Sequence, residues 1–190
     1  GSEKYEEFIF DNGIKEFVST MTKDKAPLNE PTFFVGDVPF DVRGEINKIH
    51  VEISLQYCGK SYNENVLSFV NNIRTRDGGT HEVGFRSGIT RAFNEHARMV
   101  GALKDKDVNL DGSDVREGII AIVSIRIPEN LLQFEGQTKN KLGTPEAKAA
   151  VESITYEQMK NFMAENGKIS ESLIQKAMMA AKARERARIA

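Results

Sequence analysis

Alternating apolar and polar residues predict a strand over 45–57, the clearest periodic segment of the chain. A turn then leads into a second predicted strand over 62–73, which would return beside the first as a hairpin. A third strand is predicted over 118–127, where Ile and Val dominate. The buried face of the first strand would carry Ile49, Val51, Ile53, Leu55 and Tyr57.

Weaker patterns precede these strands. Short strands are predicted at 5–10 and 32–37, with a short helix over 14–21 between them. The rest of 26–44 is predicted to be loop, because it contains Pro27, Pro31 and Pro39.

Apolar residues at helical spacing predict longer helices in the second half of the chain. One helix runs through 85–103, with Thr80 as a candidate cap. Another begins at Thr144-Pro145 and ends at 166–167, with a change of phase and a possible kink near Thr155. Ser170 would cap a final helix. An early hairpin and late helices predict an α+β fold, a small mixed sheet with helices on one face.

Composition indicates a soluble globular protein without a membrane span or a signal peptide, which we expect in the cytoplasm. The 190 residues carry a formal net charge of −2, so charge alone does not favour a nucleic-acid partner. The single Cys58 excludes an internal disulfide and suits a reducing compartment. The chain starts Gly1-Ser2, as a protease-cleaved expression scar does, so we expect a piece of a longer protein.

The segment 107–118, "DVNLDGSDVREG", begins like the calcium loop of an EF-hand. Its twelfth position is Gly118, which has no side-chain oxygen to close the ligand set. A calcium loop also needs a helix on each side, whereas a strand is predicted downstream. We therefore interpret the segment as a polar loop before a strand and expect no metal.

No complete catalytic set is visible in the sequence. His50, His81 and His96 are not spaced with Cys or acidic residues as a zinc site would be. The loop 134–143, "FEGQTKNKLG", is different, because glycines bracket Lys and amide side chains between a strand and a capped helix. Such a tip suits contact with a phosphate, although lysines in a solvated loop would look the same.

The final helix is locally basic. Its end, "KARERARIA", places three arginines close together in a strong helix former. These could face DNA phosphates, or they could simply be solvated and complement the helix dipole.

Taken together, four stretches closely resemble the transducer domain of bacterial type II topoisomerases, from the gyrase B subunit or its topoisomerase IV counterpart. They are "SFVNNIRTRDGGTHEVGFRSGITRAFN", "GSDVREGIIAIVSIRIP", "FEGQTKNKLGTPEAKAAVE" and "AAKARERARIA". The likeness covers about residues 8–190 and is weakest at 26–44. It implies the fold of the second domain of ribosomal protein S5, with a left-handed β-α-β crossover around the 85–103 helix.

The resemblance also implies site residues. By position, Lys139 would contact the γ-phosphate of ATP, and Gln137 would contact it too or help to position the attacking water. Thr138 lies between them in the same nucleotide-binding loop. Arg184, Arg186 and Arg188 would line the cavity that receives a DNA segment.

The family further implies partners and domains. Residues 3–165 would form the transducer domain, and 166–190 a helix leading toward the DNA gate. ATP and Mg²⁺ would be held mainly by an upstream GHKL ATPase domain, so this chain alone would lack a complete active site. The other partners would be the topoisomerase A subunit, DNA and, once ATP binds, a second B subunit.

An alternative is an S5-like module that binds nucleic acid through its basic helix without any nucleotide role. The sequence does not separate gyrase from topoisomerase IV.

Overall fold

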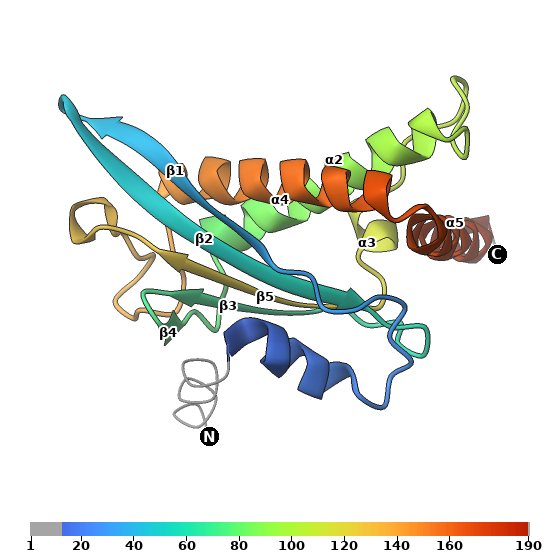
Figure 1. The fold of residues 1–190 in the computed structure, drawn as a ribbon, viewed down its shortest axis with the longest axis horizontal. Helices are drawn as coiled ribbons and strands as arrows, with labels where there is room; N and C mark the ends of the chain where they lie inside the picture. Colours follow the sequence, from blue (N-terminus) through green and yellow to red (C-terminus); the bar gives the residue numbers. More distant parts are fainter. Residues whose placement is uncertain (1–12, 190) are drawn as a thin grey trace.

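The computed structural model describes residues 13–189, which are built around one mixed sheet (Figure 1). Its five strands lie in the order β1-β2-β5-β3-β4. All neighbours are antiparallel except β3 and β5, which are parallel. The strands are β1 (Phe34–Val42), β2 (Glu45–Tyr57), β3 (Asn65–Val70), β4 (Ile73–Arg74) and β5 (Ile119–Arg126).

Strand β2 has the predicted bounds, but its hairpin partner is β1 rather than the following strand. The prediction of a hairpin between 45–57 and 62–73 was therefore wrong: β5 lies between β2 and β3. Ile119 to Val123 of β5 are all buried, so this strand is apolar on both faces and belongs at the centre of the sheet. The segment 62–73 also breaks, because Asn71 and Asn72 turn the chain at positive φ.

Strand β1 extends through most of the region predicted as loop. Pro39 lies within it opposite Lys48, which is allowed because β1 is an edge strand and one edge of its backbone needs no ladder partner. The free edge is partly covered by Gln158, whose side-chain amide bonds both the N–H and the C=O of Val35, at 3.0 and 2.8 Å. The side chain of Gln158 thus pairs backbone groups of the edge that another strand could otherwise bind.

Two helices cover one face of the sheet, α2 (Thr80–Met99) and α4 (Pro145–Glu165) (Figure 1). Between them and the sheet lies the main core, which includes Leu55, Phe85 and Phe93. Gly84 allows the two helices to cross closely, because a Cβ there would lie 2.3 Å from the carbonyl oxygen of Lys148. A helix is present where 85–103 was predicted, but it ends at Met99, and Thr80 is its first residue rather than its cap.

The expectation of helices on one face only was wrong. Residues 13–22 are helical and cover the opposite face, where Phe17 and Val18 pack with Phe69 and Ile122 (Figure 1). This second cluster exists because β3 and β5 present apolar side chains to both faces. The strand predicted at 5–10 lies outside the described residues.

Helix α4 is followed by α5 (Gly167–Ile189), with Asn166 between them as predicted. Helix α4 is continuous through Thr155, and α5 begins three residues before Ser170, so Ser170 is not its cap. Thr144 precedes Pro145 as expected, but its hydroxyl does not cap the helix. It donates to the carbonyl of Leu131 and accepts from the N–H of Gln133, which ties the preceding loop down.

Candidate functional site: a clamped, exposed loop

The loop that carries Gln137, Thr138 and Lys139 projects into solvent. All three residues are exposed, while Leu142 at the base of the loop is fully buried. The base is closed by a bridge between Phe134 and Leu142. The loop therefore has an anchored stem and an accessible tip.

The stem is bonded to the start of α2. Asp77 N–H donates to the carbonyl of Asn140 at 2.9 Å, and Leu142 N–H donates to Gly78 at 3.1 Å. Thr80 N–H in turn donates to Leu142 at 3.0 Å. The base of the loop is consequently held by residues 77–80, where α2 begins. Gly78 and Gly79 permit this close approach, since a Cβ on Gly79 would lie 2.4 Å from the carbonyl oxygen of Leu142.

The two lysines of the loop differ in their surroundings. Lys141 is paired with Glu135, with 3.1 Å between Nζ and Oε2. Lys139 makes no ion pair or hydrogen bond with any other residue of 13–189. Its ammonium group is therefore available for an external anion.

A groove of about 550 Å³ lies beside the stem of the loop. It is bounded by β3, by the segment 74–80, by the first turns of α2 and by the base of the loop. Most of its lining is polar or charged, and includes Arg74, Arg76, Asp77, Glu82, Arg86, Glu135 and Lys141.

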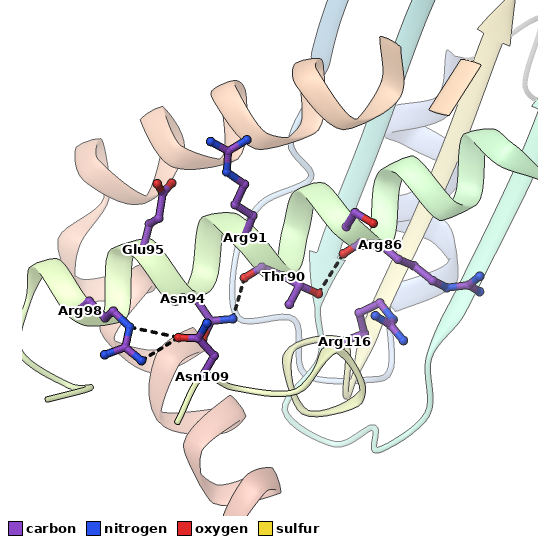
Figure 2. Close-up of a pocket in the computed structure, with 9 residues that line it drawn as sticks. Arg86, Thr90, Arg91, Asn94, Glu95, Arg98, Asn109 and Arg116 are labelled. Carbon is purple, nitrogen blue, oxygen red and sulfur yellow. Dashed lines mark hydrogen bonds between the residues drawn. The ribbon is translucent and has the colours of Figure 1, made fainter. Parts of the chain in front are cut away.

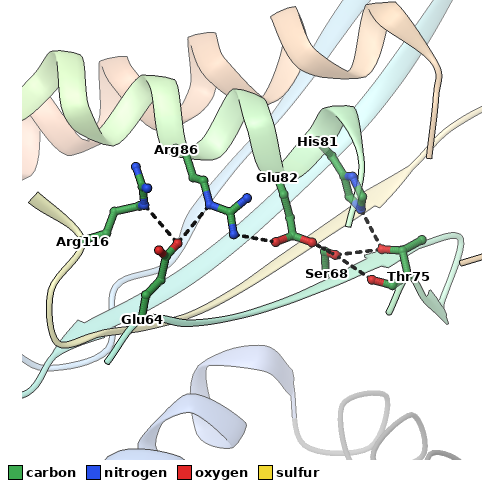
Figure 3. A network of polar contacts seen from close by, with 7 residues as sticks. All are labelled: Glu64, Ser68, Thr75, His81, Glu82, Arg86 and Arg116. Carbon is green, nitrogen blue, oxygen red and sulfur yellow. Dashed lines mark hydrogen bonds and ion pairs between the residues drawn. The ribbon is translucent and has the colours of Figure 1, made fainter. Parts of the chain in front are cut away.

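A chain of polar contacts begins inside this groove (Figure 3). The hydroxyl of Ser68 donates to Glu82 Oε2 at 2.7 Å and bonds the hydroxyl of Thr75 at 2.8 Å. Arg86 connects Glu82, at 3.3 Å, to Glu64, at 2.9 Å. Arg116 also bonds Glu64 Oε2, at 3.0 Å, so the chain leads from the first turn of α2 to the segment before β5.

His81 ends this network on the buried side. Its Nε2 bonds the hydroxyl of Thr75 at 3.0 Å, and its Nδ1 is buried without a partner. Burial lowers the pKa of His81 to about 4, since the charged imidazolium would lose its hydration. His81 is thus a neutral structural histidine next to the loop clamp.

This buried histidine predicts an acid-sensitive stability. The unfolded chain would protonate His81 near its ordinary pKa of 6.5, whereas the folded chain would not until about pH 4. The contribution of neutral His81 to the unfolding free energy is therefore fully present above pH 6.5 and is lost as the pH falls toward 4. Between pH 7 and pH 5, wild type is expected to lose about 2 kcal/mol more unfolding free energy than His81→Gln. Urea titrations at both pH values measure this; equal losses would contradict it.

A second groove, of about 570 Å³, lies along the exposed side of α2 (Figure 2). It is lined by Arg86, Arg91, Arg98 and Arg116 with a few polar neighbours. Arg98 is held by Asn109 Oδ1 at 2.7 Å and by the carbonyls of Lys104 and Asp107. The carbonyl of Asp107 and the side chain of Asn109 belong to the segment 107–118, which begins like an EF-hand loop.

Carboxylates of the segment 107–118 also bond to groups of the protein itself. Asp107 accepts from the N–H of Lys104 at 2.7 Å, and Asp111 caps the short helix α3 (Gly112–Val115). Strand β5 follows, as predicted. Within residues 13–189, no group of three or more His, Cys, Asp or Glu side chains is arranged to hold a metal ion.

The three arginines predicted to face DNA differ in their contacts. Arg184 is bound by Asp114 of α3 through two hydrogen-bonded arms, at 3.1 and 2.9 Å. Arg188 pairs with Glu185 on its own helix, and Arg186 is exposed. None lies near the 137–139 loop, because α5 and that loop are at opposite ends of the sheet (Figure 1). Their role toward DNA stays a prediction.

None of the helices in the described part of the chain is long and apolar enough to cross a membrane.

Comparison with known proteins identifies the family to which this chain belongs. The model of the DNA gyrase B family matches residues 13–190. The B subunit of DNA topoisomerase 4 from Staphylococcus epidermidis is 52% identical over 187 residues, which is 98% of this chain and 27% of that protein. The Staphylococcus aureus protein of the same name is 50% identical over the same shares. The chain thus spans 27% of the length of the curated relatives it matches.

Solved structures agree with this match. The 43K ATPase domain of Thermus thermophilus gyrase B, in complex with an aminocoumarin, has a TM-score of 0.78 and 36% identity. The match covers 93% of this chain and 44% of that one. The topoisomerase IV ATP-binding domain of Francisella tularensis has a TM-score of 0.71 at 21% identity, over 92% of this chain and 44% of that one, and shows the fold alone.

Proposed function

Since this chain belongs to the DNA gyrase B family, we propose that it is the transducer domain of a bacterial type II DNA topoisomerase B subunit. In this role it senses the γ-phosphate of ATP through Gln137, Thr138 and Lys139 and relays ATP binding and hydrolysis to DNA strand passage. The observation that carries the proposal is the loop itself, with an exposed, unpaired lysine on a stem bonded to α2.

The chemistry of the tip supports contact with a terminal phosphate. An ammonium group at about 4 Å from a phosphate oxygen gains roughly 4 kcal/mol at an effective dielectric constant near 20, before desolvation is subtracted. The amide of Gln137 can donate to a second phosphate oxygen or orient a water molecule. When the phosphate leaves, this attraction disappears and the angle between the two domains is released.

The rest of the proposal concerns groups outside this chain. ATP and Mg²⁺ would be bound mainly by an N-terminal GHKL ATPase domain, which is also where the main catalytic groups of hydrolysis would lie. The full-length protein would act with an A subunit, with DNA and with a second B subunit. It would be an ATP-hydrolysing isomerase, of which this chain supplies one part, in the cytoplasm.

The fold and domain assignments belong to the same proposal. Parallel strands β3 and β5, with α2 between them in the sequence, are compatible with an S5 domain 2-like fold and its left-handed crossover. A transducer over 3–165 and a helix over 166–190 fit the division between α4 and α5 at Asn166. The first half of α5 nevertheless packs on the body through Leu173 and Ile174.

Lysine reactivity in the intact B subunit tests the proposal. With a non-hydrolysable ATP analogue bound, Lys139 is expected to react with an acylating reagent about tenfold more slowly, because a bound phosphate would bury its amine. Lys148, exposed on α4, is the control and should react equally with and without nucleotide. Peptide mass spectrometry gives both rates. Unchanged reactivity of Lys139 would argue for the alternative, a nucleic-acid-binding module without a nucleotide role.

A further inference from the structure

One ion pair, between Arg184 and Asp114, lies where α5 stops packing on the rest of the domain. Buried residues hold the first part of the helix on the domain, and Ala180 is the last of them in the described chain. One turn later, on the same side, Arg184 reaches α3, while residues 186–189 are exposed. Arg184 therefore ties α5 to α3 one turn beyond the last buried residue of the helix.

The partner of Arg184 is a buried carboxylate. The side chain of Asp114 is only 3% exposed, whereas that of Arg184 is 47% exposed. Arg184 Nε and Nη2 bond the two carboxylate oxygens at 3.1 and 2.9 Å, and Asp111 N–H adds a third bond at 3.3 Å. A buried carboxylate that loses its guanidinium is poorly compensated, so the pair can open only if α3 also shifts toward solvent.

Helix α3 is linked to the other end of the molecule. Arg116, directly after α3, bonds Glu64, which bonds Arg86, which bonds Glu82 in the first turn of α2 (Figure 3). That turn holds the stem of the 137–139 loop. Helix α2, with 20 residues and a length of roughly 30 Å, spans the same path as a rigid rod.

We infer that the Asp114–Arg184 pair is a latch that couples the nucleotide-sensing loop to the direction of α5. The inference rests on the proposed function. In the latched state α5 is fixed to α3, and a movement of the loop that reaches α3 through Arg116 and Glu64 redirects the helix. Asp114 and Arg184 are positioning residues: they touch no nucleotide, and their loss leaves hydrolysis running without productive movement of α5.

The test uses the intact B subunit assembled with its A subunit and supercoiled DNA. Asp114→Asn keeps the shape of the side chain and an oxygen for the N–H of Asp111, but it removes the buried charge that holds Arg184. The ATP turnover of this variant should stay within about twofold of wild type, while the number of strand passages per ATP falls about fivefold or more. Arg184→Lys, which retains one charge but not the two-armed contact, should give an intermediate ratio.

Two comparisons make the result decisive. Lys182→Ala removes an exposed charge two residues from Arg184 and should keep the wild-type ratio of passages to ATP. The double variant Asp114→Asn/Arg184→Ala should equal the single Asp114→Asn variant, because both substitutions remove the same ion pair. A wild-type ratio in Asp114→Asn, or additive losses in the double variant, would overturn the latch. Neither outcome depends on the lysine-reactivity result, so the two proposals fail separately.

Discussion

Replacing Lys139 with Ala in the intact B subunit is expected to lower kcat for ATP hydrolysis about 100- to 1000-fold. The reason is electrostatic. Negative charge on the transferred phosphoryl group and on the leaving oxygen has to be stabilised in the transition state. Lys139 offers a cation on a tip that is exposed and unpaired. Nucleotide affinity should change much less, because most contacts to ATP would come from the neighbouring domain. Steady-state hydrolysis and equilibrium binding of a labelled nucleotide measure the two effects separately.

Lys141→Ala is the matched control on the same loop. Lys141 is already paired with Glu135 in this structure, so its loss should change kcat no more than about threefold. Near-wild-type hydrolysis in Lys139→Ala would refute the assignment of the loop. Equal, large losses in both variants would indicate that the loop needs its total positive charge rather than one positioned lysine.

Gly79→Ala is expected to destabilise the folded chain by about 4 kcal/mol, the largest stability effect we predict. Gly79 has φ 139° and ψ −166°, a conformation that costs an L-residue on the order of 1–3 kcal/mol. A Cβ would also lie 2.4 Å from the carbonyl oxygen and 2.5 Å from the nitrogen of Leu142. Backbone atoms cannot turn aside as a flexible side chain does, so the stem of the loop would have to move, at a further cost of about 1–3 kcal/mol.

Gly136→Ala separates backbone strain from crowding. Gly136 also has positive φ, 80°, but no atom lies within 4 Å of the position that a Cβ would take. Its substitution should therefore cost only about 1–2 kcal/mol. Urea denaturation of both variants, followed by circular dichroism, gives the comparison. Similar losses at the two positions would show that the contact between Gly79 and Leu142 is not the constraint that holds the loop.

Strand and helix positions were predictable where periodicity was strong. Apolar and polar residues alternate over 45–57 and show helical spacing in α2 and α4, so the local pattern predicts each element. The polar face of β2 is nevertheless buried at Ser54 and Gln56. Prediction failed where a local signal is overruled by position in the sheet. Pro39 suggested a loop, yet an edge strand accepts proline. Strand β5 lies between β2 and β3 because it is apolar on both faces.

The candidate site divides in the same way. The glycine-bracketed loop at 134–143 was visible in the sequence, since glycines, amides and lysines between a strand and a helix form a recognisable local pattern. Its clamp was not visible, because the bonds from Asp77 and Thr80 join segments about sixty residues apart. The ion pair between Asp114 and Arg184, 70 positions apart, was equally hidden.

By itself, the sequence determined which segments form strands and helices and which loop carries cationic groups, because these properties depend on residues a few positions apart. Only the tertiary structure decided that β5 separates β2 from β3, that the start of α2 holds the loop, and that Arg184 faces a buried carboxylate rather than solvent alone. Each of these depends on contacts between distant segments, whose energies arise only when the whole sheet is assembled and water is excluded from between the layers.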